Sequence, residues 1–341
     1  MEIVRYPPTA AARRRGSEAG LDDKLNRHGT VVTIGAFDGV HLGHQRLIER
    51  VRASAQQIGA LSAVVTFDRH PASVVRPATA PLLLTTLDEK LRLLQQTGVE
   101  LAVVVRFDEV RAAEPAAEFV GEVLVDYLHA RAVIVGHDFH FGRDREGDVP
   151  LLQRMGATMG FDVTGIRLYG ASATAGARRT SGVAAAISST RIRHLIAQGD
   201  VAAAAGMLGR WHRLAGVVGH GDKRGRELGF PTANLQVGRE MQICADGVYA
   251  GWYLRPDGTR HQTAVSVGRQ PTFYATRSFS LVEAFLLDFQ GDLYDELGTV
   301  ELVARLRGQE KFGSIDALVD QMTADVARTR EALRSPPAPA G

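Results

Sequence analysis

The 341-residue sequence contains a single cysteine, Cys244, which excludes an internal disulfide and any multi-cysteine zinc site. No apolar run approaches the ~18 residues of a membrane span. The first residues also lack the apolar core of a signal peptide. These absences predict a protein of the reducing cytoplasm that has no membrane partner.

An excess of one charge is also missing, because 40 basic residues face 38 acidic ones and the formal net charge is only +2. That balance argues against nucleic acid as a partner. Lysine is scarce, since 36 of the basic residues are arginine, whose planar guanidinium suits phosphate contacts. The hydrophobic content of 45% is that of a globular protein, and the length predicts two domains. The oligomeric state is not readable from these quantities.

The most informative stretch present runs from Val31 to Val51 and reads VVTIGAFDGVHLGHQRLIERV. It predicts a buried parallel strand, a glycine-bearing turn and a helix, whose first turn offers N–H groups to an anion. His41 and His44 are three residues apart, so they share one face and can both reach one phosphate group. A metal half-site and a polar surface are the alternatives. The other candidate ligand-binding residues of this turn are Gly35, Phe37, Asp38 and Gly39.

Three further strands, at 63–67, 101–105 and 132–135, alternate with helices at 86–96 and 116–128. This alternation predicts an α/β domain with a doubly wound parallel sheet, whose ligands lie at the carboxyl ends of the strands. Candidate binding residues follow two of these strands: Asp68, His70, Gly136, Asp138, Phe139, Phe141 and Gly142. Asp108 follows the other, and there a plain strand-end residue is an equal alternative.

Residues 1–29 are expected to be poorly ordered or loosely docked, and residues 170–186 are expected to form a mobile loop. The loop leads to ISSTRIRHLI, which predicts a helix with a polar N-terminus. Simple capping is one interpretation and phosphate binding is the other, for Ser188, Ser189, Thr190, Arg191 and Arg193. Residues 197–209 then predict a short helical connector.

After Trp211 the pattern changes to short alternating segments separated by turns, which predicts an antiparallel β-barrel closed by a helix over 315–333. The segment GHGDKRGRELGFPTANL within it combines a flexible basic loop with oxygen ligands. Thr232 and Asn234 are two apart on an extended segment and can share one Mg²⁺. An ordinary turn is the alternative. The remaining candidate ligand-binding residues are Gly219, Gly221, Lys223, Gly225, Gly229 and Pro231.

Several of these strings resemble signatures of the bacterial bifunctional riboflavin kinase/FAD synthetase family. GAFDGVHLGHQ resembles the HxGH signature of nucleotidyltransferases, TFDRHP and GHDFHFG resemble two further family motifs, and SSTRIR is intact. GFPTAN, GVYAG, VGRQPTF and VEAFLLDF resemble the flavokinase module over residues 209–333. This sequence departs from the family at Arg69, His140 and Asp295, which stand where proline, arginine and glycine are usual.

The resemblance implies an FMN adenylyltransferase domain over 1–204 and a riboflavin kinase domain over 205–341. It implies that His41 and His44 stabilise charge on the nucleotide phosphates and that the SSTRIR segment closes over ATP. It also implies that Thr232 and Asn234 bind Mg-ATP. Glu283 would be the general base, with its pKa raised by partial desolvation. Without the family, Glu283 is an outward residue on a half-buried strand.

The activity so implied is phosphorylation of riboflavin to FMN with ATP, followed by transfer of AMP from ATP to FMN to give FAD and pyrophosphate. Mg²⁺ is the implied cofactor. Two alternatives are a nucleotidyltransferase with another acceptor, such as a pantetheine or cytidylyl enzyme, and a non-catalytic flavin-binding regulator. The first leaves GFPTAN and VEAF unexplained, and the second leaves the intact set of candidate catalytic residues unexplained.

Overall fold

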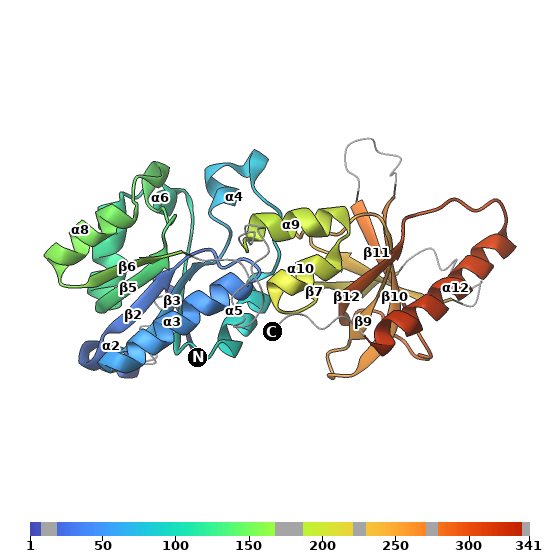
Figure 1. Ribbon diagram of the computed structural model, residues 1–341, viewed down its shortest axis with the longest axis horizontal. Coiled ribbons are helices and arrows are strands. Elements are labelled where there is room, and N and C mark those ends of the chain that lie inside the picture. The colour runs from blue at the N-terminus through green and yellow to red at the C-terminus, as the bar shows by residue number, and fades with distance from the viewer. Residues whose placement is uncertain (8–18, 168–186, 221–229, 271–278, 336–341) are drawn as a thin grey trace, which may run out of the picture. The chain divides into compact units, whose positions relative to one another are not determined.

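A computed structural model describes residues 1–7, 19–167, 187–220, 230–270 and 279–335 (Figure 1). The chain forms two compact units: the first comprises Met1–Pro81 and Thr85–Ile187, and the second comprises Leu82–Leu84 and Ser188–Gly341. The predicted boundary at 204/205 lies inside helix α10(Val201–Leu208), whereas the units divide at 187/188. No helix among the described residues is long and apolar enough to cross a membrane.

The first unit contains a six-stranded parallel sheet in the order β1-β4-β3-β2-β5-β6, which confirms the predicted fold class. Its strands are β1(Glu2–Tyr6), β2(Thr30–Ile34), β3(Leu61–Phe67), β4(Leu101–Val105), β5(Ala130–Gly136) and β6(Asp162–Ile166). Its longer helices are α2(Ala19–His28), α3(Leu42–Ile58), α5(Leu87–Gln96) and α8(Val149–Met159). Its shorter helical segments are α4(Ala72–Val75), η1(Pro77–Thr79), α6(Glu109–Ala112), α7(Ala116–Phe119), η2(Val120–Tyr127) and η3(Arg143–Arg145).

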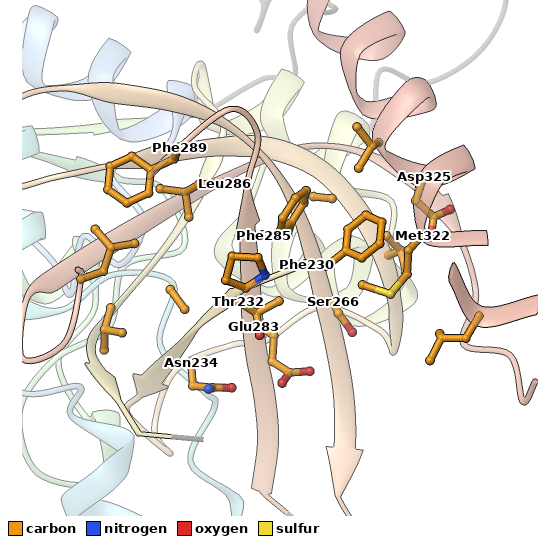
Figure 2. A pocket seen from close by; sticks show the side chains of 18 of the residues that line it. Phe230, Thr232, Asn234, Ser266, Glu283, Phe285, Leu286, Phe289, Met322 and Asp325 are labelled. Atoms are coloured by element: carbon orange, nitrogen blue, oxygen red, sulfur yellow. The ribbon is translucent and has the colours of Figure 1, made fainter. Parts of the chain in front are cut away.

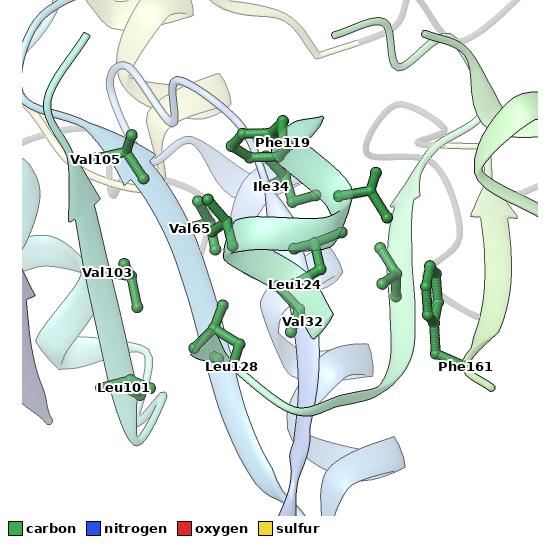
Figure 3. Packing of buried hydrophobic residues seen from close by; sticks show 14 of the residues in the cluster. Val32, Ile34, Val65, Leu101, Val103, Val105, Phe119, Leu124, Leu128 and Phe161 are labelled. Atoms are coloured by element: carbon green, nitrogen blue, oxygen red, sulfur yellow. The ribbon is translucent and has the colours of Figure 1, made fainter. Parts of the chain in front are cut away.

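Both faces of this sheet are covered by helices, because successive strand residues point to opposite sides. On one face, side chains of α3 and α5 such as Ile48 and Leu94 pack on Val31 and Val64. On the other face, α2, α7, η2 and α8 cover the alternate strand residues. Figure 3 shows this second layer, where side chains of α7 and η2 lie over the strands. Strands buried on both faces explain the continuous apolar runs in the sequence.

The strand order places the functional motifs at the switch point of the sheet. The chain runs from β2 outward through β3 to β4, and then returns to the other side of β2 with β5. The segments that follow β2 and β5 therefore leave adjacent strands in opposite directions, and this is where open α/β sheets bind ligands. These two segments contain the GAFDGVHLGH and GHDFHFG motifs.

The expectation for residues 1–29 is wrong for the described part of that segment. Glu2–Tyr6 form β1, which pairs in parallel with Leu101–Val105 of β4, and Ala19–His28 form α2. Leu21 and Leu25 of this helix are buried in the core. The mixed composition concealed an edge strand whose partner among the described residues, β4, lies about a hundred residues further along the chain.

Two further differences concern helices. The helix predicted over 116–128 is present as α7 and η2, but its second part is π-helical. Helix α8 was not predicted. Strand β6 was not predicted either, because it is a short, largely exposed edge strand with a weak apolar pattern. The loop predicted over 170–186 lies outside the described residues.

The second unit is a closed antiparallel barrel in the order β10-β11-β8-β7-β12-β9, as predicted. Its strands are β7(His212–Gly219), β8(Thr232–Val237), β9(Gly247–Leu254), β10(Arg260–Gln270), β11(Phe279–Leu286) and β12(Leu297–Arg307). Helices α9(Ser189–Gln198), α10 and α12(Ile315–Arg334) belong to the same unit. Alternate residues such as Leu214 and Val218 of β7 are buried while Ala215 and Val217 are exposed, which is the pattern of a barrel strand.

Candidate active sites

The two histidines of the first motif lie together at the start of α3. His41 is the N-cap of this helix, and its Nδ1 accepts a hydrogen bond from the backbone N of His44 at 3.3 Å. The two rings are stacked, with 3.6 Å between centroids. Their shared face was predicted from the three-residue spacing. Because Nδ1 of His41 is the acceptor, the proton of the neutral ring lies on Nε2.

The backbone that leads to these histidines adopts a conformation unusual for its residue types. Phe37 has φ 48° and Val40 has φ 35°, although neither is glycine. Asp38 holds the turn, since its Oδ1 accepts from the backbone N of Thr85 at 3.1 Å and from the Thr85 hydroxyl at 3.2 Å. The backbone N of Gly39 donates to the same hydroxyl at 3.1 Å. Asp38 and Gly39 thus position the turn, and Thr85 was not anticipated from the sequence.

The glycine between the two histidines is required by close packing. A Cβ on Gly43 would lie 3.2 Å from the His41 ring and 3.6 Å from the carbonyl oxygen of Ile187. Any side chain there would press on the His41 ring. Ile187 is buried and is the last residue of the first unit.

A cavity of about 630 Å³ lies beside this turn in the first unit. Its aromatic lining comes from Phe67, Phe107, Phe119, Phe139 and Phe141. Phe139 and Phe141 are stacked with 5.3 Å between centroids, and Phe67 meets Phe107 edge to face at 5.2 Å. A planar ring system is the chemistry that such a slot accommodates.

The structure divides the other predicted residues of this unit into two groups. Gly35, His70 and Gly142 line the cavity with Phe139 and Phe141. Asp68 instead accepts a hydrogen bond from the backbone N of Phe107 at 2.8 Å, so it joins the segments after β3 and β4. Phe37, Gly136 and Asp138 are not among the described lining residues. Asp108 caps α6 by accepting from the N of Arg111 at 3.0 Å, which fits its plain structural interpretation.

Two departures from the family motifs have local partners. Arg69 binds the carboxylate of Asp68 through Nε and Nη2 at 3.3 and 3.2 Å. His140 lines the cavity, and its Nδ1 lies 2.9 Å from the carbonyl oxygen of Asp138. The His140 ring therefore contacts the backbone of the loop to which it belongs.

The SSTRIR segment begins α9 in the second unit. The Ser188 hydroxyl caps the helix by accepting from the N of Arg191 at 3.3 Å. The guanidinium of Arg193 donates through Nε to the carbonyl oxygen of Leu82 at 2.6 Å. Ser189, Thr190 and Arg191 lie on the first turn, and Thr190 and Arg191 are exposed. Capping is therefore observed, while the proposed ATP contacts of these residues stay a prediction.

A second cavity, of about 610 Å³, lies within the barrel unit. Thr232 and Asn234 of β8 line it, as does Glu283 of β11, and Figure 2 shows the side chains of Asn234 and Glu283 close together. Asn234 is opposite Glu283 in the strand register, and Glu283 is opposite Ser266 of β10. A polar row therefore crosses three neighbouring strands. Ser266 was not singled out from the sequence, because its strand partner is revealed only by the register.

The cavity also has apolar walls, and α12 contributes to them. Phe230 and Phe285 meet at 5.2 Å, and Met322 of α12 contributes to the wall. The helix is held by a buried ion pair, in which Nη2 of Arg307 lies 2.7 Å from Oδ2 of Asp325. These side chains are 11% and 6% exposed. Both residues line the cavity, and neither was predicted.

Two of the remaining candidates of the second unit, Gly219 and Pro231, are among the described residues. Pro231 lines the cavity, and Gly219 is paired with Asn234 at the end of β7. Asp295 has φ 60°, the left-handed conformation that favours glycine, so the turn keeps a glycine-like backbone. The predicted residues Gly221, Lys223, Gly225 and Gly229 lie outside the described residues.

The oxygen-bearing side chains of the barrel cavity fit a hard cation. Among the residues that the structure describes, no group of three His, Cys, Asp or Glu side chains could hold a metal ion. Hydroxyl and amide oxygens are further ligands for such a cation. Thr232 and Asn234 supply oxygen atoms two residues apart on β8, beside Glu283 of the neighbouring strand, which suits Mg²⁺ shared with phosphate oxygens.

The first unit has stacked histidines at the switch point of a parallel sheet, and the second has a carboxylate beside oxygen ligands in a barrel. Together these features define a two-domain transferase of phosphate-bearing groups. The family model described as FAD synthetase matches residues 23–177, and the one described as riboflavin kinase matches residues 208–333. The chain belongs to the family of bifunctional riboflavin kinase/FMN adenylyltransferases, and its two units match both activities.

Individual relatives cover nearly the whole chain. The bifunctional riboflavin kinase/FMN adenylyltransferase of Pseudomonas fluorescens is 39% identical over 94% of this chain and 98% of its own length. The enzyme of that name from Escherichia coli (strain K12) is 36% identical over 89% of this chain and 93% of its own length. A crystal structure described as a macrolide-efflux protein from Streptococcus pneumoniae matches with a TM-score of 0.76 and 31% identity, covering 89% of this chain and 94% of that one.

Proposed function

We propose that this chain makes FAD from riboflavin in two steps at two separate sites. The barrel unit transfers the γ-phosphoryl group of ATP to riboflavin and gives FMN and ADP. The α/β unit transfers AMP from a second ATP to FMN and gives FAD and pyrophosphate. The observation that carries this proposal is the polar row of Asn234, Glu283 and Ser266 in a cavity that also has aromatic and aliphatic walls.

In the kinase step, the apolar part of the barrel cavity takes the flavin ring and the polar row takes the ribityl chain. The carboxylate of Glu283 accepts the proton of the terminal ribityl hydroxyl while the oxygen of that hydroxyl attacks the γ-phosphorus of ATP. Thr232 and Asn234 hold Mg²⁺, which when bound neutralises charge on the ATP phosphates. Positioning and charge neutralisation account for most of the rate in such transfers.

In the adenylyl transfer step, a phosphate oxygen of FMN attacks the α-phosphorus of ATP and pyrophosphate leaves without a covalent intermediate. The aromatic cavity of the first unit takes the flavin ring. His41 and His44 lie at the N-terminus of α3, where ring N–H donors and helix N–H groups stabilise negative charge on the phosphates.

The experiment that tests both steps is incubation of the purified chain with riboflavin, ATP and Mg²⁺, followed by chromatography of the flavins and assay of pyrophosphate. FMN should appear first and FAD should follow with one pyrophosphate for each FAD. A nucleotidyltransferase with another acceptor would leave riboflavin unchanged. A non-catalytic flavin-binding protein would retain flavin and consume no ATP.

The expectation that the chain acts in the cytoplasm, without nucleic acid or a membrane as partner, stays a prediction from its composition. Size-exclusion chromatography with light scattering would measure the oligomeric state. Fractionation of cells that express the tagged chain would test its location.

A further inference from the structure

A lysine outside every motif contacts the turn between β2 and α3, which leads from Gly35 to His41. Lys90 belongs to α5 and is only 7% exposed. Of the three lysines that the structure describes, the other two, Lys24 and Lys311, are exposed. Burial lowers the pKa of Lys90 to about 8, and the carboxylates of Asp38 and Asp68 oppose that shift. An arginine, which cannot give up its charge, would be harder to bury at this position.

The ammonium of Lys90 joins two adjacent strands at their carboxyl ends. Nζ donates to the carbonyl oxygen of Phe67 at 2.8 Å and to that of Ala36 at 3.2 Å. Phe67 is the last residue of β3, and Ala36 follows β2 by two residues. Both residues line the aromatic cavity, whereas Lys90 does not. The lysine therefore contacts residues of the cavity wall without lining the cavity itself.

The same turn is held from two further sides. The Thr66 hydroxyl donates to the Ala36 carbonyl oxygen at 3.2 Å, and Thr85 binds Asp38 and Gly39. Thr85 directly precedes Thr86, the N-cap of α5. Positive φ values at non-glycine residues persist only where surrounding contacts enforce them. Lys90 of α5 and Thr85, just before the N-cap of this helix, thus both hold the turn between Gly35 and His41.

Packing alone does not account for a lysine at this place. A methionine has a similar length and would fill the same space without the cost of burying a charge. What the lysine adds is the pair of hydrogen bonds that fixes Ala36 relative to Phe67. Because Ala36 leads through Phe37 and Asp38 to His41, these bonds set where the histidines stand relative to the aromatic cavity.

We propose that Lys90 is a positioning residue for adenylyl transfer, which holds the turn between β2 and α3 in register with the end of β3. This inference rests on the proposed adenylyl transfer in the first unit. Lys90 makes no contact with the substrate and takes no part in proton transfer.

The test is the full-length Lys90→Met variant, with Lys24→Met on the exposed side of α2 as the matched control. The rate of FAD formation from supplied FMN and ATP is measured with both KM values, beside the kinase rate and the thermal unfolding midpoint. We expect kcat for FAD formation to fall about 10–100-fold, because small displacements of aligned groups cost this much. Both KM values should stay within about threefold of the native values, and the kinase rate should not change.

A second variant guards against misfolding of the first. Thr66→Val removes the other hydrogen bond to the Ala36 carbonyl oxygen at nearly constant volume, and kcat should fall by about threefold to tenfold. The proposal is overturned if Lys90→Met forms FAD at a native kcat. It is also overturned if Lys90→Met unfolds while Thr66→Val keeps a native kcat. If the native chain forms no FAD from FMN, the proposed function itself fails.

Discussion

Each candidate catalytic side chain is positioned by neighbours that a local motif does not contain. His41 and His44 are stacked because His41 caps α3, and the turn before them is held by Thr85. Glu283 stands in a polar row because the barrel register places it between Asn234 and Ser266. The two sets lie in different units, so we expect substitutions to separate the two activities.

His44→Ala should stop FAD formation and leave FMN formation nearly intact. His44 lies on the first turn of α3, and loss of one preorganised donor typically costs about 10²–10³-fold in rate. FMN should accumulate when riboflavin, ATP and Mg²⁺ are supplied and the products are separated by chromatography. The exposed His28 of α2 provides the control, since His28→Ala should change neither rate. Equal loss of both products would contradict two independent sites.

Glu283→Gln should have the reverse effect, because it keeps the side-chain shape and removes the proton acceptor. The kinase rate should fall about 10²–10⁴-fold, whereas supplied FMN should still become FAD at the native rate. Glu310→Gln changes an exposed carboxylate of the same unit and should leave the kinase rate unchanged. A decrease of less than about tenfold in Glu283→Gln would assign the base to another residue.

At the scale of elements, a buried ion pair helps to hold α12, which lines the barrel cavity. Arg307 projects from β12, and its guanidinium binds Asp325 through Nε and Nη2. Gln321 donates to the same carboxylate at 2.9 Å. An amphipathic pattern predicted the helix, whereas the partners of Asp325 and of the buried Leu333 are visible only in the structure.

Asp325→Asn should lower the free energy of unfolding of the barrel by about 3 kcal/mol, since it leaves the Arg307 guanidinium buried without its counter-ion. Both tryptophans of the chain, Trp211 and Trp252, lie in the barrel unit, so tryptophan fluorescence during urea unfolding reports on that unit. Asp320→Asn, on an exposed position of the same helix, is the control. Equal unfolding midpoints for the two variants would mean that the ion pair contributes little.

At the scale of the whole molecule, the two helices before the barrel belong with it. Ile192 and Ile196 of α9 and Val201 and Ala204 of α10 are buried, and both helices are part of the second unit. The motifs for adenylyl transfer precede these helices, apart from SSTRIR, which begins α9, whereas those for phosphorylation all follow them. The units should therefore be separable in the laboratory.

We expect fragment 188–341 to fold and to phosphorylate riboflavin without the first unit. Fragment 205–341 should also form the barrel, but it begins inside α10 and loses four buried apolar side chains, which are worth about 1.5–3 kcal/mol each for the larger ones. Its urea midpoint should be lower than that of the longer fragment. Folded fragments without kinase activity, beside an active full-length chain, would show that the first unit contributes to the kinase site.

The local sequence predicted most elements and both sets of motifs, because they depend on contacts within a few residues. The apolar run Val31–Ile34, the paired histidines and the alternating segments after Trp211 each specify a strand, a shared face or a sheet without reference to the rest of the chain. Strand β1 was missed for the opposite reason, since its partner β4 is far away in sequence.

By itself, then, the sequence determined the fold class, the order of the two modules and the residue types that perform the proposed chemistry. Only the tertiary structure decided which side chains support them. Lys90 meets Ala36 and Phe67, Ser266 stands opposite Glu283, and Arg307 binds Asp325. Each of these contacts joins residues on different elements, so no local periodicity or motif predicts it. The physical reason is that burial and strand register are set by the whole packed core.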